Sequence, residues 1–199
     1  MLNLVDLVLT DPPYNCGKDY LIYKDNLPES EYHDFMREVV VRTLMIGKNH
    51  FWMAPRYQIK FWLSLFPDAH LIVIPRRAAG PFRGGWSDQF EIGLAVGKPK
   101  GAPPDLWNGI RLKGEGYFSI EETYDHPGYT PIEIMAWAIR YLSNDIILDP
   151  FVGTGTSLVA AKNLNRKSIG IEINPKYCEI SVKRLRQEVF DFRKPKEEL

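Results

Sequence analysis

Residues 145–176 decide the fold, and they read DIILDPFVGTGTSLVAAKNLNRKSIGIEINPK. The apolar run at 145–148 predicts a buried strand, and the alternation that follows 155 predicts a helix over 156–163. Gly153 and Gly155 lie between the two, where a chain that leaves a strand must turn tightly into a helix. This segment therefore predicts one strand, one glycine-rich turn and one helix.

A second strand is predicted at 168–173, with Glu172 at its end. Asn174 and Pro175 then mark a helix start, because asparagine is a good N-cap and proline suits the first helical position. The helix that follows is expected to run to about residue 190. Strand, helix and strand in this order indicate a parallel βαβ unit.

The rest of the chain continues this alternation of strands and helices. We expect strands at 2–10, 50–54, 69–74 and 90–96 and helices at 30–45, 57–66 and 131–142, with loops at 15–28 and 75–87. The segment 97–131 is rich in glycine and proline, shows little periodicity and predicts a long irregular excursion. The pattern predicts a single α/β domain over 1–199, a three-layer structure with a mostly parallel sheet.

Composition and charge narrow the function classes. The 199 residues hold 25 Lys+Arg and 25 Asp+Glu, so the formal net charge is zero. That balance argues against a polybasic binder, although local patches still decide nucleic-acid binding. The apolar runs are too short to span a membrane, and the first ten residues lack the basic start of a signal peptide. Cys16 and Cys178 form neither a disulfide framework nor a zinc cluster, which indicates a reduced, cytoplasmic setting.

The glycine-rich loop and Glu172 together indicate a nucleoside cofactor. Free amides at a helix start suit an anionic group, and an acid at the end of the next strand can accept hydrogen bonds from ribose hydroxyls. The loop lacks the third glycine of the dinucleotide fingerprint and the Gly-Lys-Ser/Thr of a phosphate-binding loop. A plain strand-to-helix turn and a helix-end acid remain the structural alternatives.

The most specific feature is the tetrad Asp11-Pro12-Pro13-Tyr14, directly after the first apolar strand. The Asp11 carboxylate and the proline carbonyls can accept hydrogen bonds from one amino group, whose lone pair then points toward an electrophile. Tyr14 offers a flat face on which a base can stack. Pro-Pro would also serve as a rigid turn, but the tyrosine beside it favours the functional interpretation.

These motifs resemble the S-adenosylmethionine-dependent amino DNA methyltransferases, which act on adenine N6 or cytosine N4. The tetrad comes first and the Phe-x-Gly-x-Gly loop (151–155) last, which resembles the beta group. The stretches 126–131 (HPGYTP) and 170–177 (GIEINPKY) also fit. The resemblance implies a Rossmann-like class I methyltransferase fold with permuted motif order, and it makes Asp11, Pro12, Pro13 and Tyr14 the catalytic residues. It implies that the cofactor contacts Asp149, Phe151, Gly153, Thr154, Gly155, Thr156, Ser157, Glu172, Ile173, Asn174 and Thr130.

The chain departs from the family pattern at three places. Thr130 stands where the family usually has a basic residue, near the methionine end of the cofactor. The chain starts almost at the tetrad strand, so we expect a sheet of the seven-stranded type that is one strand short. The target-recognition region, about 97–125, is brief, which predicts recognition of a short or relaxed site.

Two stretches of the predicted loops are basic and predict contacts with nucleic acid. They contain Arg76, Arg77 and Arg83 in the first and Lys98 and Lys100 in the second. Such side chains contact phosphates and give affinity without sequence information. Trp86, Trp107, Tyr117 and Phe118 could stack on bases, with core filling as the alternative for Trp86 and Phe118. The histidines have no ligand spacing, so we expect no metal site.

The resemblance implies methyl transfer to the N6 amine of a flipped adenine in DNA. The first alternative is cytosine N4, because the same acceptors serve either amine. The second is a non-catalytic cofactor-binding subunit that needs a partner. DNA is the expected partner, no membrane is involved, and a homodimer or a partner subunit stays open. We expect the protein in the cytoplasm of a bacterium or of a viral host cell.

Overall fold

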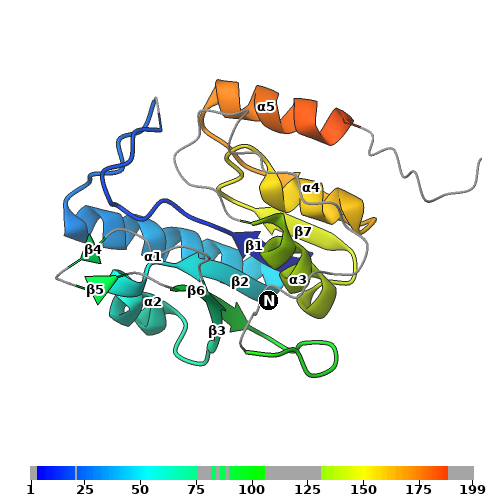
Figure 1. Ribbon diagram of the computed structural model, residues 1–199, viewed down its shortest axis with the longest axis horizontal. Helices are drawn as coiled ribbons and strands as arrows, with labels where there is room; N and C mark the ends of the chain where they lie inside the picture. Colours follow the sequence, from blue (N-terminus) through cyan, green and yellow to red (C-terminus); the bar gives the residue numbers. More distant parts are fainter. Residues whose placement is uncertain are drawn as a thin grey trace, which may run out of the picture.

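The structure is a computed structural model that describes residues 4–20, 22–75, 82–83, 86–87, 90–105 and 131–187. Strands and helices alternate along the chain, as the sequence predicts (Figure 1). The elements are β1 (Val5–Thr10), α1 (Glu29–Ile46), β2 (Gly47–Ala54), a 3-10 turn η1 (Arg56–Gln58), α2 (Ile59–Leu65), β3 (His70–Pro75), β4 (Phe82–Arg83), β5 (Trp86–Ser87), β6 (Phe90–Val96), α3 (Ile132–Leu142), β7 (Ile146–Asp149), α4 (Thr156–Asn163), β8 (Lys167–Gly170) and α5 (Pro175–Arg186).

The main sheet has six strands in the order β3-β6-β2-β1-β7-β8. The strands β2, β1, β7 and β8 are mutually parallel, with Leu7 opposite both Asn49 and Ile147. Strand β6 runs antiparallel to β2 and to β3. The mostly parallel Rossmann-like sheet that the sequence predicts is therefore confirmed, and within the described residues β8 is an edge strand.

Helices cover both faces of the sheet. Successive side chains of the central strands point to opposite faces and are apolar on both, so both faces must be covered. Phe51 and Met53 of β2 face the cluster that contains α3 and part of α4. Trp52 and Ala54, one residue out of step, face the cluster that α1 and α2 cover. The layers are thus helix, sheet and helix, with both apolar clusters formed around β1 and β2.

Two features differ from the sequence prediction. The segment 75–87 contains a two-stranded hairpin, β4 and β5, where a plain loop is expected. Strand β8 ends at Gly170, so Glu172 lies in the loop after the strand and not within it. A Cβ at Gly170 would lie 2.3 Å from a methyl of Val152, so the loop before α4 packs directly on the end of β8.

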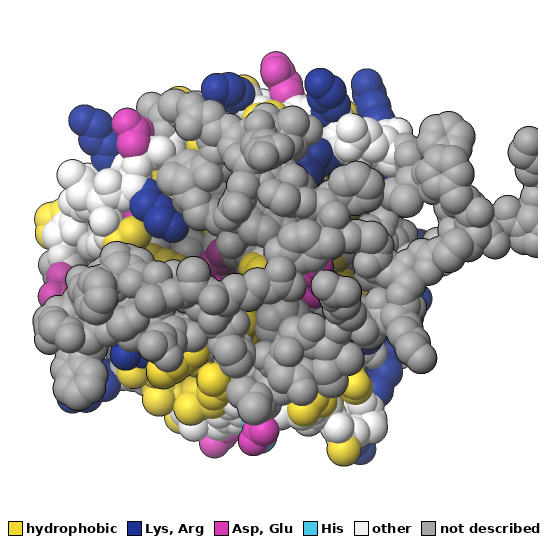
Figure 2. Space-filling model, in the orientation of Figure 1, with side chains coloured by type: hydrophobic (Ala, Val, Ile, Leu, Met, Phe, Trp, Pro, Cys, Tyr) yellow, Lys and Arg dark blue, Asp and Glu magenta, His cyan; other side chains and the backbone are white. Residues whose placement is uncertain are grey.

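Basic side chains gather over α5, the last described helix (Figure 2). Its last turn carries Lys183, Arg184 and Arg186, where positive charge interacts favourably with the helix dipole. Across the described part of the chain, no helix combines the length and apolarity that crossing a membrane requires.

A substitution at Gly93 tests the packing of the sheet centre. A Cβ at Gly93 of β6 would lie 2.4 Å from Cζ of Phe51, which is fully buried. We predict that Gly93→Ala lowers the free energy of unfolding by about 1–3 kcal/mol, because overpacking displaces a ring that has no room to move. Urea denaturation measures this value, with Lys48→Ala at an exposed position of β2 as the control. An unchanged midpoint for Gly93→Ala would show that the ring relaxes freely.

Candidate functional site

The tetrad and the glycine-rich loop meet at the carboxyl ends of two neighbouring strands of the sheet. They follow β1 and β7, which are parallel neighbours, so both leave the sheet at its carboxyl end. Together they line a cavity of about 1080 Å³. The cavity contains Asp11, Pro12, Pro13, Tyr14, Asp149, Phe151, Gly153, Thr154, Thr156, Ser157, Glu172, Ile173 and Asn174 among its lining residues. Gly155, also predicted for the cofactor, is the N-cap of α4.

A buried carboxylate joins the two loops. Asp149, 3% exposed, accepts hydrogen bonds from the Thr10 hydroxyl at 2.6 Å, from the Phe151 amide at 2.9 Å and from the Ser157 hydroxyl. Burial raises the pKa of Asp149 to about 6, while these hydrogen bonds act in the opposite direction. Because Thr10 directly precedes Asp11, this network fixes the tetrad relative to the glycine-rich loop.

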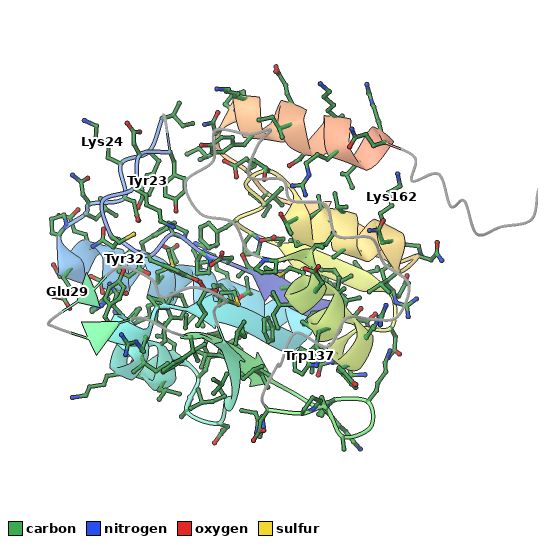
Figure 3. The ribbon with its side chains drawn as sticks, viewed as in Figure 1. Tyr23, Lys24, Glu29, Tyr32, Trp137 and Lys162 are labelled. Carbon is green, nitrogen blue, oxygen red and sulfur yellow. The ribbon has the colours of Figure 1, made fainter. Side chains whose placement is uncertain are left out.

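The tetrad carbonyls divide into two groups. The Pro13 carbonyl accepts from the Tyr32 hydroxyl of α1 at 2.9 Å (Tyr32 is labelled in Figure 3), and the Tyr14 carbonyl accepts from the Tyr57 hydroxyl at 2.8 Å. The sequence suggests that both proline carbonyls can face one amine, and the Pro13 carbonyl already accepts one hydrogen bond. Asp11, Pro12 and Pro13 all line the cavity.

The side chain of Tyr14 is hydrogen-bonded to the carboxylate of Asp11, the first residue of the same tetrad. Its hydroxyl donates to Oδ1 of Asp11, and the Lys18 ammonium lies 5.8 Å from the centre of its ring. Burial, with the neighbouring Asp11 charge, raises the pKa of the Tyr14 hydroxyl well above its ordinary value. Tyr14 is therefore a neutral hydrogen-bond donor.

Glu172 has two amide donors within the site. Its Oε2 accepts from the Gly153 amide and its Oε1 from the Asn174 amide, each at 2.8 Å. Each carboxylate oxygen has a further lone pair for a hydroxyl donor. Glu172 thus holds the glycine-rich loop against the start of α5 while it lines the cavity.

The glycine-rich loop has its own supports from α5. Gly153 and Gly155 have φ of +53° and +89°, a region that favours glycine. The Ser181 hydroxyl donates to the Gly153 carbonyl at 3.0 Å, and the Arg184 guanidinium donates to the Thr154 carbonyl at 2.7 Å. Arg184 is only 6% exposed. Through Ser181 and Arg184, α5 holds the glycine-rich loop in place.

Residues 15–20 and 22–25 form a strap that crosses from the tetrad toward the start of α5. Asp25, fully buried, accepts from the amides of Asn15 at 2.7 Å and Cys16 at 2.9 Å. Asn15 has a φ of +54°, which asparagine tolerates better than most residues. Sequence reasoning treats 15–28 as a plain loop and misses the strap.

Helix α1 forms a wall of the cavity that the sequence prediction also misses. Phe35, Val39, Thr43 and Ile46 of this helix line the cavity. The Phe35 ring lies edge-on to that of Phe151, with centroids 6.1 Å apart. A helical apolar face alone predicts a core contact, so no sequence signal marks it as part of a site.

The predicted nucleic-acid contacts separate in space. Lys98 and Lys100 follow β6, whose Val96 pairs with His50 near the start of β2. They therefore lie at the amino ends of the parallel strands, and the tetrad lies at the carboxyl ends. The Lys100 ammonium donates to the Ser143 carbonyl behind α3. The structure therefore does not bring these two lysines to the site.

The strand residues that flank the segment with the three arginines lie at the other end of the sheet. Pro75 and Phe90, which flank this segment, are paired at the same end of the sheet as the tetrad. Arg76 and Arg77 lie outside the described residues, and so do Thr130, Trp107, Tyr117, Phe118 and the side chains of Arg83 and Trp86.

Comparisons with known proteins agree with this geometry. The family model described as DNA methylase matches residues 98–183. The type II methyltransferase M.HpaI of Haemophilus parainfluenzae is 30% identical over 223 residues, which cover 96% of this chain and 71% of the relative. The DNA adenine methyltransferase YhdJ of Escherichia coli is 24% identical, with 91% of this chain and 76% of the relative covered.

A solved structure extends the comparison to the cofactor. The complex of M1.HpyAVI with SAM, S-adenosylmethionine, superimposes with a TM-score of 0.62 at 25% identity, covering 90% of this chain and 88% of that one. Sequence relatives, family model and fold point the same way. The chain belongs to the S-adenosylmethionine-dependent amino DNA methyltransferases, the family that acts on adenine N6 or cytosine N4.

Proposed function

We propose that this chain transfers a methyl group from S-adenosylmethionine to the exocyclic N6 amine of adenine in DNA. The observation that carries the proposal is the shared cavity of the tetrad and the glycine-rich loop, locked together through Thr10 and Asp149. An amine acceptor and a cofactor loop on adjacent parallel strands bring the two reacting groups to one place. Much of the rate then comes from their alignment.

Asp11 and the Pro12 carbonyl orient the target amine. Both accept its N–H groups, so the nitrogen lone pair points away from them and toward the cofactor loop. The target base must leave the duplex stack, because its amine is not accessible to this cavity otherwise. As the base enters, the hydrogen bond from Tyr14 to Asp11 gives way, and the tyrosine ring becomes available to stack on the base.

The residues of the cavity suit the cofactor. Glu172 has free lone pairs for ribose hydroxyls, and the loop over 151–157 offers a close backbone approach beside an aromatic ring, Phe151. When bound, S-adenosylmethionine supplies an electrophilic methyl on a positively charged sulfur. The aromatic rings of the cavity, among them Tyr14 and Tyr20, favour a positive charge near them.

Two observations support adenine as the target. The tetrad begins with aspartate, which the family resemblance associates with adenine. The relative YhdJ, which matches most of this chain, is named as a DNA adenine methyltransferase. Cytosine N4 is the other amine that the same acceptors would serve.

The decisive experiment uses the chain alone with labelled S-adenosylmethionine and unmethylated plasmid DNA. Digestion of the product to nucleosides should give N6-methyladenine as the labelled species. Label in N4-methylcytosine would overturn the choice of adenine. No transfer, with cofactor binding intact, would assign the chain as a subunit that needs a partner.

We predict that Asp11→Ala lowers the rate of methyl transfer by roughly 100-fold or more, because the amine loses its main orienting acceptor. The dissociation constant of the cofactor, measured by calorimetry, should change little, since the residues assigned to the cofactor follow β7 and β8. Asp34→Ala, an exposed acid of α1 paired with Arg37, is the control and should retain full activity. Near-normal transfer by Asp11→Ala would refute the role of this carboxylate.

We predict that Glu172→Ala raises the dissociation constant of the cofactor by roughly 5- to 150-fold, which corresponds to about 1–3 kcal/mol of charge-assisted hydrogen bonds. The loss includes the support that Glu172 gives to the Gly153 amide. DNA affinity without cofactor should barely move. Glu179→Ala, an exposed acid of α5, serves as the control, and equal cofactor affinity of the two variants would make Glu172 a helix-end acid only.

A further inference from the structure

Hydrogen bonds hold the strap at both ends of the cavity. At the tetrad end the strap is closed within itself, because the Asp25 carboxylate accepts from the amides of Asn15 and Cys16. At the cofactor end, Nδ2 of Asn174 donates to the Tyr20 carbonyl at 3.1 Å. Between the two ends, the strap closes on itself through hydrogen bonds from Gly17 to Asp25 at 2.6 Å and from Tyr20 to Tyr23 at 3.1 Å.

The inner face of the strap forms part of the cavity. Tyr20 and Tyr23 line it together with Glu172 and Asn174, so the strap and the cofactor segment bound the same space. The described strap residues are not among the buried residues of either core cluster. The Asn174 amide therefore matters to the strap as a polar contact with the segment that carries Glu172.

The Asn174 amide serves two separable purposes. Its Oδ1 accepts from the Lys176 amide at 3.0 Å and so caps α5. Its Nδ2 makes the contact with Tyr20. The side chain is buried, with 3% exposed, and the two partners fix which way the amide points.

We propose that Asn174 is a positioning residue that holds the strap closed over the bound cofactor. Its amide connects the segment that carries Glu172 to the strap, and Asp25 closes the two ends of the strap on each other. Release of the cofactor then requires the hydrogen bond from Asn174 to Tyr20 to open. The inference rests on the proposed function only through the cofactor and not through the identity of the methylated base.

The chemistry of asparagine allows the two purposes to be separated. Aspartate and serine are as good at the N-cap as asparagine, so Asn174→Asp and Asn174→Ser keep the cap on α5. Neither donates to the Tyr20 carbonyl: the aspartate presents an oxygen there, and the serine is too short. The two variants differ in charge, so an effect common to both does not come from charge. An effect that also reaches the strap amides in the absence of cofactor comes from the lost hydrogen bond to Tyr20 and not from a lost contact with the cofactor.

The experiment measures the dissociation rate of S-adenosylmethionine from the full chain by stopped-flow displacement. Both variants should release the cofactor about 3- to 10-fold faster than the parent chain, the factor expected for one neutral hydrogen bond. Hydrogen exchange without cofactor should accelerate at the amides of Tyr20 and Asp25 and stay unchanged at Lys176 and Cys178, which report the cap. Lys24→Ser, at an exposed strap position that projects outward in Figure 3, is the matched control and should match the parent.

Three results would overturn the inference. The first is an unchanged dissociation rate in both variants, and the second is a faster rate in Asn174→Asp alone, which would show an effect of charge. The third is faster exchange at Lys176 and Cys178 together with the strap, which would show that Asn174 acts only as a helix cap. Absence of cofactor binding to the parent chain would instead refute the cofactor assignment behind the proposed function.

Discussion

The buried carboxylate of Asp149 is the constraint on which the site depends. A charge removed from water is costly unless it is hydrogen-bonded, and here three donors converge on it, from the end of β1, from the glycine-rich loop and from the first turn of α4. Thr10 ends the tetrad strand, whereas Ser157 lies in the first turn of α4. Any shift of one loop against the other would leave a buried charge with an unfilled acceptor. This network thus fixes the position of the tetrad relative to the glycine-rich loop.

Hydrogen bonds from tyrosine hydroxyls hold the backbone of the tetrad as well. Tyr32 and Tyr57 donate from α1 and η1 to the carbonyls of Pro13 and Tyr14, which fixes the backbone of the tetrad. All four tetrad residues line the cavity. The tetrad side of the cavity is therefore held by α1 and η1, and the strap is the side that we propose to open.

Local sequence signals predicted the elements well and the long-range contacts poorly. The helix at 156–163 and the strand at 90–96 agree with the structure to the residue, because glycine, proline and apolar runs mark their ends. Strand β8 is shorter than expected, since the packing of Val152 on Gly170 is a tertiary contact. Lys98 and Lys100 show a further limit: a basic loop is visible in sequence, but the edge of the sheet on which it lies depends on the antiparallel pairing of β6.

The catalytic geometry is assembled by contacts between the two ends of the chain. The hydrogen bond between Thr10 and Asp149 joins residues that are 139 positions apart in the sequence. The bond between Asp6 and the Ile146 amide spans 140 positions, and the bond between Tyr20 and Asn174 spans 154 positions. The first two pairs align β1 with β7 at the start and at the end of the strands, so they set the register. The third lies on the strap, outside the sheet, and has no strand to support it. Because the first two contacts hold the halves together without it, the Asn174 contact is free to open and close while the reacting groups stay aligned.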